Sequence, residues 1–144
     1  FLILDLPPGT GDIQLTLVQK LALTGAIIVT TPQKLALLDV KKGADMFNKV
    51  NTPVLGVVEN MTHFMCPHCN GMTKIFPGDG GIEESSRLDV PLLGRIYLSP
   101  EISESTENGV PYVLKHENSP ITSEYNNIAS QIDKIVGVSV LSTM

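Results

Sequence analysis

The sequence contains few cysteines, no excess of positive charge and no long hydrophobic run. Its two cysteines, Cys66 and Cys69, are too few for a disulfide framework and favour a reducing compartment. A formal net charge of −5 argues against general binding to nucleic acid or to an anionic membrane, because both need a basic surface. No apolar run approaches the roughly 18 residues of a membrane-spanning helix. With 144 residues and 42% hydrophobic content, the chain is expected to form one soluble, intracellular domain.

A glycine-rich phosphate-binding loop of the form G-x-x-x-x-G-K-[ST] is also missing from the sequence. The first residue is Phe1 instead of methionine, and it opens an apolar run that only Asp5 interrupts. We therefore expect the chain to begin inside a fold, without the strands and the loop that would precede Asp5.

Apolar runs alternate with segments of helical periodicity along the chain. The apolar runs are near-continuous, which is typical of parallel strands covered on both faces: Phe1–Leu6, Ala26–Thr30, Val54–Val58 and Leu92–Leu98. Helical spacing predicts helices over Gln14–Ala22, over Leu37–Val50, over Ile82–Leu88, and from an N-cap at Ser119 to a stop at Gly137.

This alternation predicts an α/β fold, a doubly wound, mostly parallel sheet with helices on both faces. We expect the domain to cover residues 1–137 and to be followed by a short tail, 138–144. Two stretches are predicted as long loops, 63–81 and 99–118. The first of them bears both cysteines, and long loops in compact domains are usually functional.

The segment after the first predicted strand has the composition of a phosphate-sensing turn. A strand that ends in Asp5 brings a carboxylate to the sheet edge where nucleotides bind, and there it can hold a magnesium-bound water. Pro7 and Pro8 stiffen the turn, while Gly9 lets backbone N–H groups approach a phosphate. Asp12 either orders a lytic water or caps the next helix. In the alternative interpretation, Asp5 only ends a strand and begins a turn.

Cys66 and Cys69 are separated by two residues, so both thiolates can bind one metal. A four-thiolate cluster needs two more ligands than the chain has, which suggests that two chains related by a twofold axis share one site. A second possibility is zinc, with His63 as a further ligand at matching spacing. A third is a thiol oxidoreductase, which would place Cys66 at a helix N-terminus. His68 is expected to be a loop residue, and His116 a surface residue.

Three motifs occur in order along the chain. They are D-L-P-P-G-T-G-D at Asp5–Asp12, L-T-G-A-I-I-V-T-T-P-Q at Leu23–Gln33, and V-V-E-N-M at Val57–Met61 leading into C-P-H-C at Cys66–Cys69. In this combination the chain resembles the Mrp/ApbC family, whose members are P-loop ATPases of the MinD/ParA type that carry iron–sulfur clusters. The resemblance implies a partial P-loop NTPase fold that lacks the N-terminal strands and the phosphate-binding loop.

The resemblance also implies a function, an ATP-dependent carrier or scaffold that binds an iron–sulfur cluster and transfers it to apoproteins. The cluster, expected to be 4Fe–4S, would bridge Cys66 and Cys69 of a homodimer. In the intact protein, an ATPase with Asp5 and Asp12 as catalytic residues, ATP and Mg²⁺ would bind at Asp5, Pro7, Pro8, Gly9 and Asn60. The expected partners are a second copy and iron–sulfur apoproteins, without nucleic acid or membrane, in the cytoplasm or the mitochondrial matrix.

Asn60 has two possible roles at the end of the third predicted strand. Its amide offers both a donor and an acceptor, as recognition of an adenine edge requires, and the resemblance implies that role. Alternatively, Asn60 satisfies a turn. Two other functions also stay open, a MinD/ParA-type partitioning or positioning ATPase without metal, and a zinc-stabilised interaction module. The cysteine pair argues against the first of these.

Overall fold

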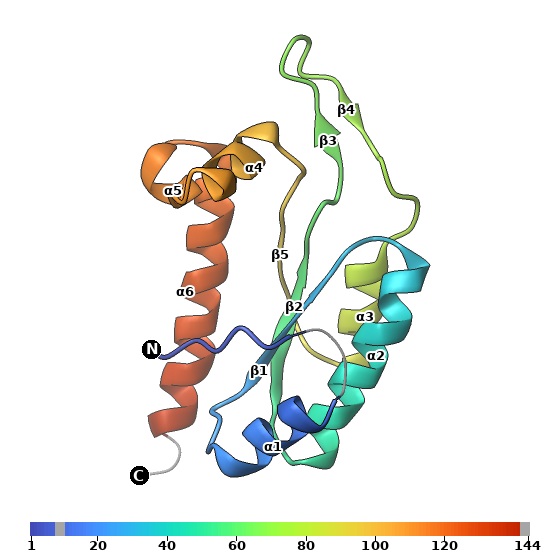
Figure 1. Cartoon of the computed structure of the whole chain (residues 1–144), viewed down its shortest axis with the longest axis vertical. Helices are drawn as coiled ribbons and strands as arrows, with labels where there is room; N and C mark the ends of the chain where they lie inside the picture. Colours follow the sequence, from blue (N-terminus) through green and yellow to red (C-terminus); the bar gives the residue numbers. More distant parts are fainter. Residues whose placement is uncertain (8–10, 142–144) are drawn as a thin grey trace.

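The computed structural model describes residues 1–7 and 11–141, and a three-stranded parallel sheet lies at its centre (Figure 1). Its strands are β1 (Ala26–Thr30), β2 (Val54–Glu59) and β5 (Leu92–Arg95), in the order β1-β2-β5. Parallel neighbours need crossover connections, and these contain the helices α2 (Lys34–Lys49) and α3 (Gly80–Leu88). The predicted α/β class, with a parallel sheet and helices on both faces, is confirmed.

Helices cover the two faces of the sheet unequally (Figure 1). On one face α2 and α3 pack against the strands, and Ile28 and Val57 are buried there. On the other face α6 (Pro120–Leu141) packs against β5, where Ile128 is buried with Val58 and Leu93. Burial of these apolar side chains is the main favourable term in the stability of the fold.

The strand predicted over Phe1–Leu6 is not formed, so that prediction is wrong. Residues 1–7 belong to no helix or strand, and Phe1, Leu2 and Ile3 are 90%, 87% and 86% exposed. In Figure 1 this segment crosses the direction of the strands instead of running along β1. A strand is held by hydrogen bonds to a neighbouring strand, and no strand of the described sheet pairs with this segment. Its hydrophobicity indicated burial but could not supply a partner.

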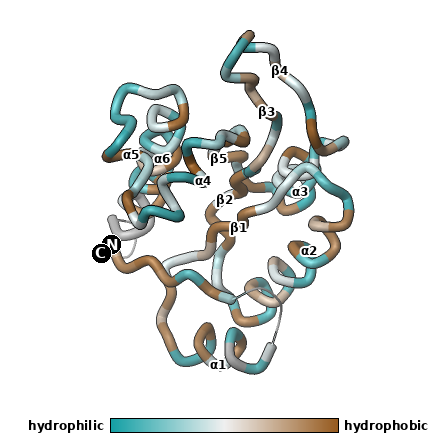
Figure 2. The backbone as a smooth tube through the Cα atoms, turned by 45° about the horizontal axis from the view of Figure 1, so that its top comes forward, coloured by the Kyte–Doolittle hydropathy of each residue, from teal (hydrophilic) through white to brown (hydrophobic). Residues whose placement is uncertain are grey.

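One face of β1 is open, although its apolar run was predicted to be covered on both faces. Side chains along β1 alternate between buried and exposed, and Val29 is 60% exposed. Val29 is paired in register with Val58, which places it on the face where α6 packs over Val58 and β5. Figure 2 shows that the N-terminal segment and β1 are both hydrophobic, and Ile27 of β1 is also exposed, at 37%.

Both stretches predicted as loops contain regular structure. Within 63–81, β3 (Phe64–Met65) and β4 (Met72–Thr73) form an antiparallel hairpin. Within 99–118 lie α4 (Pro100–Glu107) and α5 (Tyr112–Lys115). Ser99 caps α4 by accepting a hydrogen bond from Glu101 N at 3.2 Å. α4 has few apolar residues and α5 has only four residues in all, so hydrophobic periodicity does not reveal these helices.

α5 explains the position of His116, which was predicted to lie at the surface. The His116 ring stacks on Tyr112 of α5 with the ring centroids 4.6 Å apart, and the residue is half-buried. Thr122 Oγ1 donates a hydrogen bond to the His116 carbonyl oxygen at 2.7 Å, which ties α5 to the start of α6. The surface prediction is therefore wrong, because stacking on Tyr112 depends on a fold that a lone histidine does not reveal.

The helices at the two ends of the chain differ from their predicted bounds. α1 (Asp12–Lys20) begins at Asp12 with Gly11 in the N-cap position, so Asp12 is not the cap. Ser119 caps α6 as predicted, since its Oγ accepts a hydrogen bond from Thr122 N at 3.0 Å. The stop predicted at Gly137 is wrong, because one glycine lowers helix propensity without ending a helix. Residues 138–141 of the predicted tail thus belong to α6, and 142–144 lie outside the described residues.

Among the helices of the described residues, α6 is the longest, with 22 residues. Neither α6 nor any shorter helix there is long and apolar enough to cross a membrane. Its apolar stripe instead faces the sheet, where Ile121 and Ile128 are buried.

Candidate functional site

The two cysteines lie in the turn of the β3–β4 hairpin, which extends beyond the C-terminal ends of the sheet strands (Figure 1). The turn is closed by hydrogen bonds from Cys66 N to Gly71 O at 3.0 Å and from Asn70 N to Cys66 O at 2.9 Å. Cys66 is half-buried, Cys69 is exposed, and both are free thiols. The fold therefore presents two accessible sulfur atoms near the tip of a projecting element.

Hydrogen bonds converge on the Cys66 sulfur. The backbone N–H groups of His68 and Cys69, and then the Cys69 side chain, lower the pKa of the Cys66 thiol below its ordinary value. A lower pKa means a larger thiolate fraction at neutral pH, and the thiolate is the form that binds metals. Both cysteines lie in the same short turn. The pair can therefore act as two ligands of one metal or cluster.

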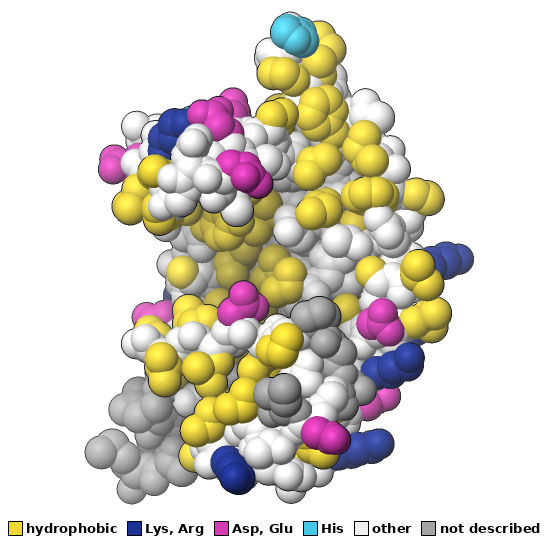
Figure 3. Space-filling model, in the orientation of Figure 1, with side chains coloured by type: hydrophobic (Ala, Val, Ile, Leu, Met, Phe, Trp, Pro, Cys, Tyr) yellow, Lys and Arg dark blue, Asp and Glu magenta, His cyan; other side chains and the backbone are white. Residues whose placement is uncertain are grey.

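The surface around the cysteines is rich in apolar side chains. Figure 3 shows hydrophobic side chains gathered over the hairpin, with a histidine at its tip. Met61, Met72 and Ile75 are 37%, 67% and 47% exposed. His68 lies in the turn and is exposed, as predicted for a loop residue. An exposed apolar patch of this kind is typical of a surface that contacts another protein.

His63 lies at the base of the hairpin and does not join the cysteines. Its Nδ1 is 2.9 Å from Thr62 Oγ1, and its ring stacks on Tyr97 with the centroids 5.3 Å apart. Burial, and then the positive charge of Arg95, lower the pKa of His63. Within residues 1–7 and 11–141, no three His, Cys, Asp or Glu side chains are gathered as a metal site would require. The predicted zinc set of His63 with both cysteines is therefore not assembled.

The arrangement expected of a thiol oxidoreductase is not present either. Cys66 follows β3 in a hairpin turn, and the next helix of the chain, α3, begins only at Gly80. The hydrogen bonds of the turn, not a helix dipole, account for the lowered pKa of the Cys66 thiol.

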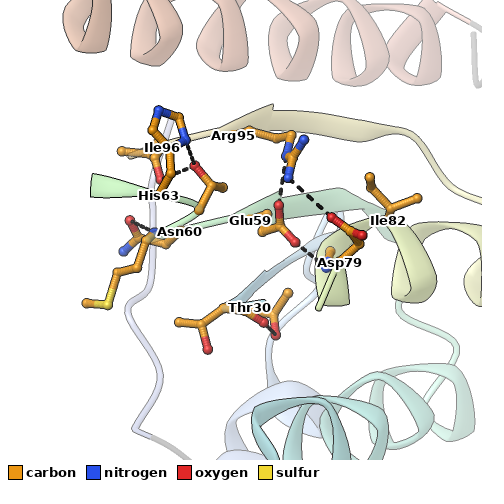
Figure 4. A network of polar contacts seen from close by, with 12 residues as sticks. Thr30, Glu59, Asn60, His63, Asp79, Ile82, Arg95 and Ile96 are labelled. Carbon is orange, nitrogen blue, oxygen red and sulfur yellow. Dashed lines mark hydrogen bonds and ion pairs between the residues drawn. The ribbon is translucent and has the colours of Figure 1, made fainter. Parts of the chain in front are cut away.

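Asn60 follows β2 at the edge of the sheet where β1 also ends. Its N–H donates a hydrogen bond to Thr30 O at 2.7 Å, which joins the ends of the two strands. Its side-chain oxygen accepts a hydrogen bond from Met61 N at 2.9 Å (Figure 4). This is the turn contact predicted as the alternative role of Asn60. Recognition of a base by the same amide stays a proposal.

The residues predicted to bind nucleotide do not all lie together in the structure. Asp5 and Asp12 are exposed, and α1 lies at the end of the sheet opposite to the hairpin in Figures 1 and 2. The Pro7 carbonyl oxygen accepts a hydrogen bond from Gln14 Nε2 at 2.8 Å. Two of the predicted residues lie outside the described residues, Pro8 and Gly9. The structure therefore keeps Asp12 apart from Asn60, and the roles of this set stay predictions.

Glu59, the residue before Asn60, is a charged side chain in the buried part of β2. It is 0% exposed, and its Oε2 accepts a hydrogen bond from Arg95 Nε at 2.7 Å, while Oε1 accepts one from Gly81 N at 2.9 Å (Figure 4). Arg95 Nη2 also lies 3.8 Å from Asp79 Oδ1. A buried carboxylate is costly unless it is paired and hydrogen-bonded, and Glu59 is both. The network joins β2, β5 and α3 at the base of the hairpin.

Sequence analysis missed Glu59 and Arg95, although the sequence contains a signal for both. Glu59 directly follows the apolar run Val54–Val58, and a charge at the end of a buried strand needs a partner. Arg95 stands at the corresponding place after Leu92–Gly94, and the sheet register pairs it with Glu59. Opposite charges at the ends of neighbouring parallel strands could have identified the pair.

Comparisons with known proteins agree with this architecture. A family model described as ParA, NUBPL iron-transfer P-loop NTPase, matches residues 1–133. An iron-sulfur cluster carrier protein of Pseudomonas fragi is 49% identical over 129 residues, covering 90% of this chain and 45% of that protein. The iron-sulfur cluster transfer protein NUBPL of Mus musculus is 46% identical over 132 residues, covering 92% of this chain and 41% of that protein.

A solved structure shows the same fold. The nucleotide-binding protein from Archaeoglobus fulgidus, in complex with ADP, has a TM-score of 0.67 and 34% identity, covering 81% of this chain and 46% of that one. The chain thus spans less than half the length of each of these proteins. The resemblance to the Mrp/ApbC carriers, predicted from the three motifs, is confirmed. The chain belongs to the ParA family of NUBPL iron-transfer P-loop NTPases.

Proposed function

We propose that this chain is the cluster-binding part of an ATP-dependent iron–sulfur carrier, which holds a cluster through Cys66 and Cys69 and transfers it to apoproteins. The main support for this proposal is the cysteine pair in the hairpin turn. It presents two adjacent free thiols, one with a lowered pKa, and the described residues gather no third metal ligand around them. An exposed and incompletely ligated site suits a cargo that must be handed on, whereas a closed four-ligand site suits a permanent structural metal. The names of the relatives, cluster carrier and cluster transfer proteins, support the same role.

The number of ligands favours a 4Fe–4S cluster shared by two chains. Such a cluster is commonly held by four thiolates, and each chain supplies two. A homodimer with its twofold axis through the site would complete the set from two copies of one hairpin. The exposed Met72 and Ile75 side chains suit the close approach of a second apolar surface. Client apoproteins would approach the same tip.

Dependence on ATP and Mg²⁺ is proposed for the intact protein, because the residues present do not make a complete nucleotide site. The 144 residues contain no G-x-x-x-x-G-K-[ST] loop, and the side-chain oxygen of Asn60 is bonded to Met61 N. We place residues 1–137 in the C-terminal part of a P-loop NTPase domain. The proposed nucleotide and catalytic residues are Asp5, Pro7, Pro8, Gly9, Asp12 and Asn60.

Anaerobic reconstitution with iron and sulfide tests the carrier proposal. We expect about four iron atoms per dimer and a broad charge-transfer absorbance, without stoichiometric zinc. Cys66→Ala and Cys69→Ala should each abolish cluster uptake while leaving the far-ultraviolet circular dichroism unchanged, because the turn lies outside the apolar core. Zinc binding without iron uptake would instead support a zinc-stabilised interaction module.

Light scattering on the same samples tests the sharing of the cluster. The loaded protein should be a dimer, and chelation of the iron should shift it toward monomer, because the cluster would be the link between the chains. The cysteine variants are the controls and should stay monomeric under both conditions. A loaded protein that is strictly monomeric would contradict the bridging model.

A further inference from the structure

The two limbs of the hairpin are anchored to the sheet in different ways. The outgoing limb, 61–65, is tied to the chain after β5 by backbone hydrogen bonds, from Thr62 N to Ile96 O at 3.1 Å and from Leu98 N to His63 O at 2.7 Å. The return limb, 72–76, pairs with the outgoing limb through β3 and β4 and carries Lys74, whose Nζ lies 3.1 Å from Oδ1 of Asp79, the residue at the N-cap position of α3. Backbone hydrogen bonds thus join the outgoing limb directly to the chain after β5, whereas the return limb pairs with the outgoing limb and is linked to the start of α3 by a side-chain ion pair.

Four charged side chains lead from the interior of the sheet to the return limb. The distances are 2.7 Å from Glu59 to Arg95, 3.8 Å from Arg95 to Asp79 and 3.1 Å from Asp79 to Lys74. Side-chain exposure rises along this chain from 0% at Glu59 through 41% and 50% to 59% at Lys74. Charges interact strongly in the buried interior, whereas an exposed pair is weak and is screened by salt. Asp79 therefore lies between the strong Glu59–Arg95 pair, which is partly buried, and its own weak, exposed pair with Lys74.

The backbone on both sides of Asp79 is fixed independently of its charge. Gly78 has a φ of +113°, and a Cβ at this position would collide with the Pro32 carbonyl oxygen. A Cβ on Gly80 would lie 2.7 Å from Thr31 O. These close approaches hold the segment around Asp79 against the loop that follows β1. Removing the charge of Asp79 should therefore release Lys74 without displacing the start of α3.

We propose that Asp79 is a positioning residue for the cysteine hairpin. Its ion pair with Lys74 links the return limb to the start of α3, and breaking that pair lets the hairpin with Cys66 and Cys69 move as a unit without disturbing the buried Glu59–Arg95 pair. The inference rests on the proposed function, in which this turn binds the cluster. Movement of the hairpin then regulates how easily the same two thiols gain or release their cargo.

Hydrogen exchange on the full chain without cluster tests the positioning role. In Asp79→Asn, which keeps a good N-cap residue for α3, amides of residues 62–76 should exchange about two- to five-fold faster at low salt, the range of an exposed ion pair. Added salt should bring the wild type up to the rate of the variant, whose own rate should not respond. Lys74→Gln should behave like Asp79→Asn, and the double variant should add nothing further.

The control is Lys115→Gln, which breaks another exposed ion pair, 2.8 Å long, between Lys115 and Glu104. It should leave exchange in the hairpin unchanged. Equal hairpin exchange in the wild type and Asp79→Asn at low salt would overturn the proposal. Faster exchange that spreads to β1 and β2 would also overturn it, because it would show a general loss of stability.

Release of a reconstituted cluster to an iron chelator gives a second readout. Asp79→Asn should release the cluster faster than the wild type by a similar ratio, and the salt dependence of release should disappear. If the wild type takes up no cluster, the proposed function fails, while hydrogen exchange still decides the positioning role. If the wild type loads and both proteins release at the same rate, positioning by Asp79 is refuted and the carrier function stands.

Discussion

The buried network around Glu59 and the hairpin that follows it hold polar groups in two different ways. Glu59 is fixed by an ion pair to β5 and a backbone hydrogen bond from α3, and its own carboxylate is fully buried. In the hairpin turn, hydrogen bonds join residues close in sequence, such as Cys66 and Gly71, and the cysteines are accessible. We therefore expect the sheet edge around Glu59 to resist local unfolding, whereas the hairpin can open locally while the sheet stays folded.

Among the variants that change a polar contact, the largest effect on stability is expected from Arg95→Gln, which breaks the ion pair with Glu59. The change leaves the Glu59 carboxylate buried and without its ion-pair partner, so the free energy of unfolding should fall by about 3 kcal/mol. This lies at the low end for a buried pair, because Arg95 itself is 41% exposed. Urea denaturation followed by circular dichroism measures the loss.

A double variant, Glu59→Gln with Arg95→Gln, is the control for this prediction. A neutral amide costs less to bury than an unpaired carboxylate, and it can still accept the hydrogen bond from Gly81 N. The double variant should therefore be more stable than Arg95→Gln alone. A loss below about 0.5 kcal/mol in the single variant would show that the pair is no stronger than one at the surface.

The parts of the fold that could be predicted depend on residues that are close together in the sequence. The strand Ala26–Thr30 has the predicted bounds, and Ser119 caps α6 as expected, because an apolar run and an N-cap are local patterns. The strand over Phe1–Leu6 failed because pairing needs a partner elsewhere in the chain. The stop at Gly137 failed because one glycine lowers helix propensity without ending a helix.

The candidate site could also be predicted from the sequence only in part. The spacing of Cys66 and Cys69 predicts two adjacent ligands, and the structure places both in one hairpin turn, where the Cys69 side chain contributes to the lowered pKa of Cys66. That His63 would lie apart, stacked on Tyr97, could not be predicted, because equal spacing in sequence does not fix the direction of a side chain. The link from Glu59 to Arg95 depends on sheet register, which the apolar runs alone do not define.

For the hairpin we expect a smaller effect, which concerns the reactivity of the Cys66 thiol and not the stability of the fold. The lowered pKa of Cys66 means that its thiolate forms at a lower pH than that of an ordinary cysteine. Alkylation of the cluster-free protein by iodoacetamide should therefore rise at lower pH for Cys66 than for a cysteine in a small peptide. Mass spectrometry of the labelled peptide across a pH series measures the midpoint.

Cys69→Ala provides the control for the alkylation prediction. It removes the side-chain hydrogen bond to the Cys66 sulfur, so the pKa of Cys66 should move back toward its ordinary value and the alkylation midpoint should rise. The backbone N–H groups of residues 68 and 69 stay in place, so the return should be partial. A midpoint that does not move would show that the two sulfur atoms are not in contact.

The smallest effect is expected for Met72→Gln on the exposed side of the hairpin. Met72 is 67% exposed, so the substitution removes little buried apolar surface and should change the free energy of unfolding by less than about 0.5 kcal/mol. Leu93→Ala is the contrasting core variant, because Leu93 is 0% exposed and its truncation should cost about 2–5 kcal/mol. Urea denaturation of both variants measures the difference. If Met72→Gln cost more than about 1 kcal/mol, that loss would be too large for an exposed side chain. The hairpin would then be packed as part of the core, and the contrast between a hairpin that opens locally and a sheet edge that stays folded would be wrong.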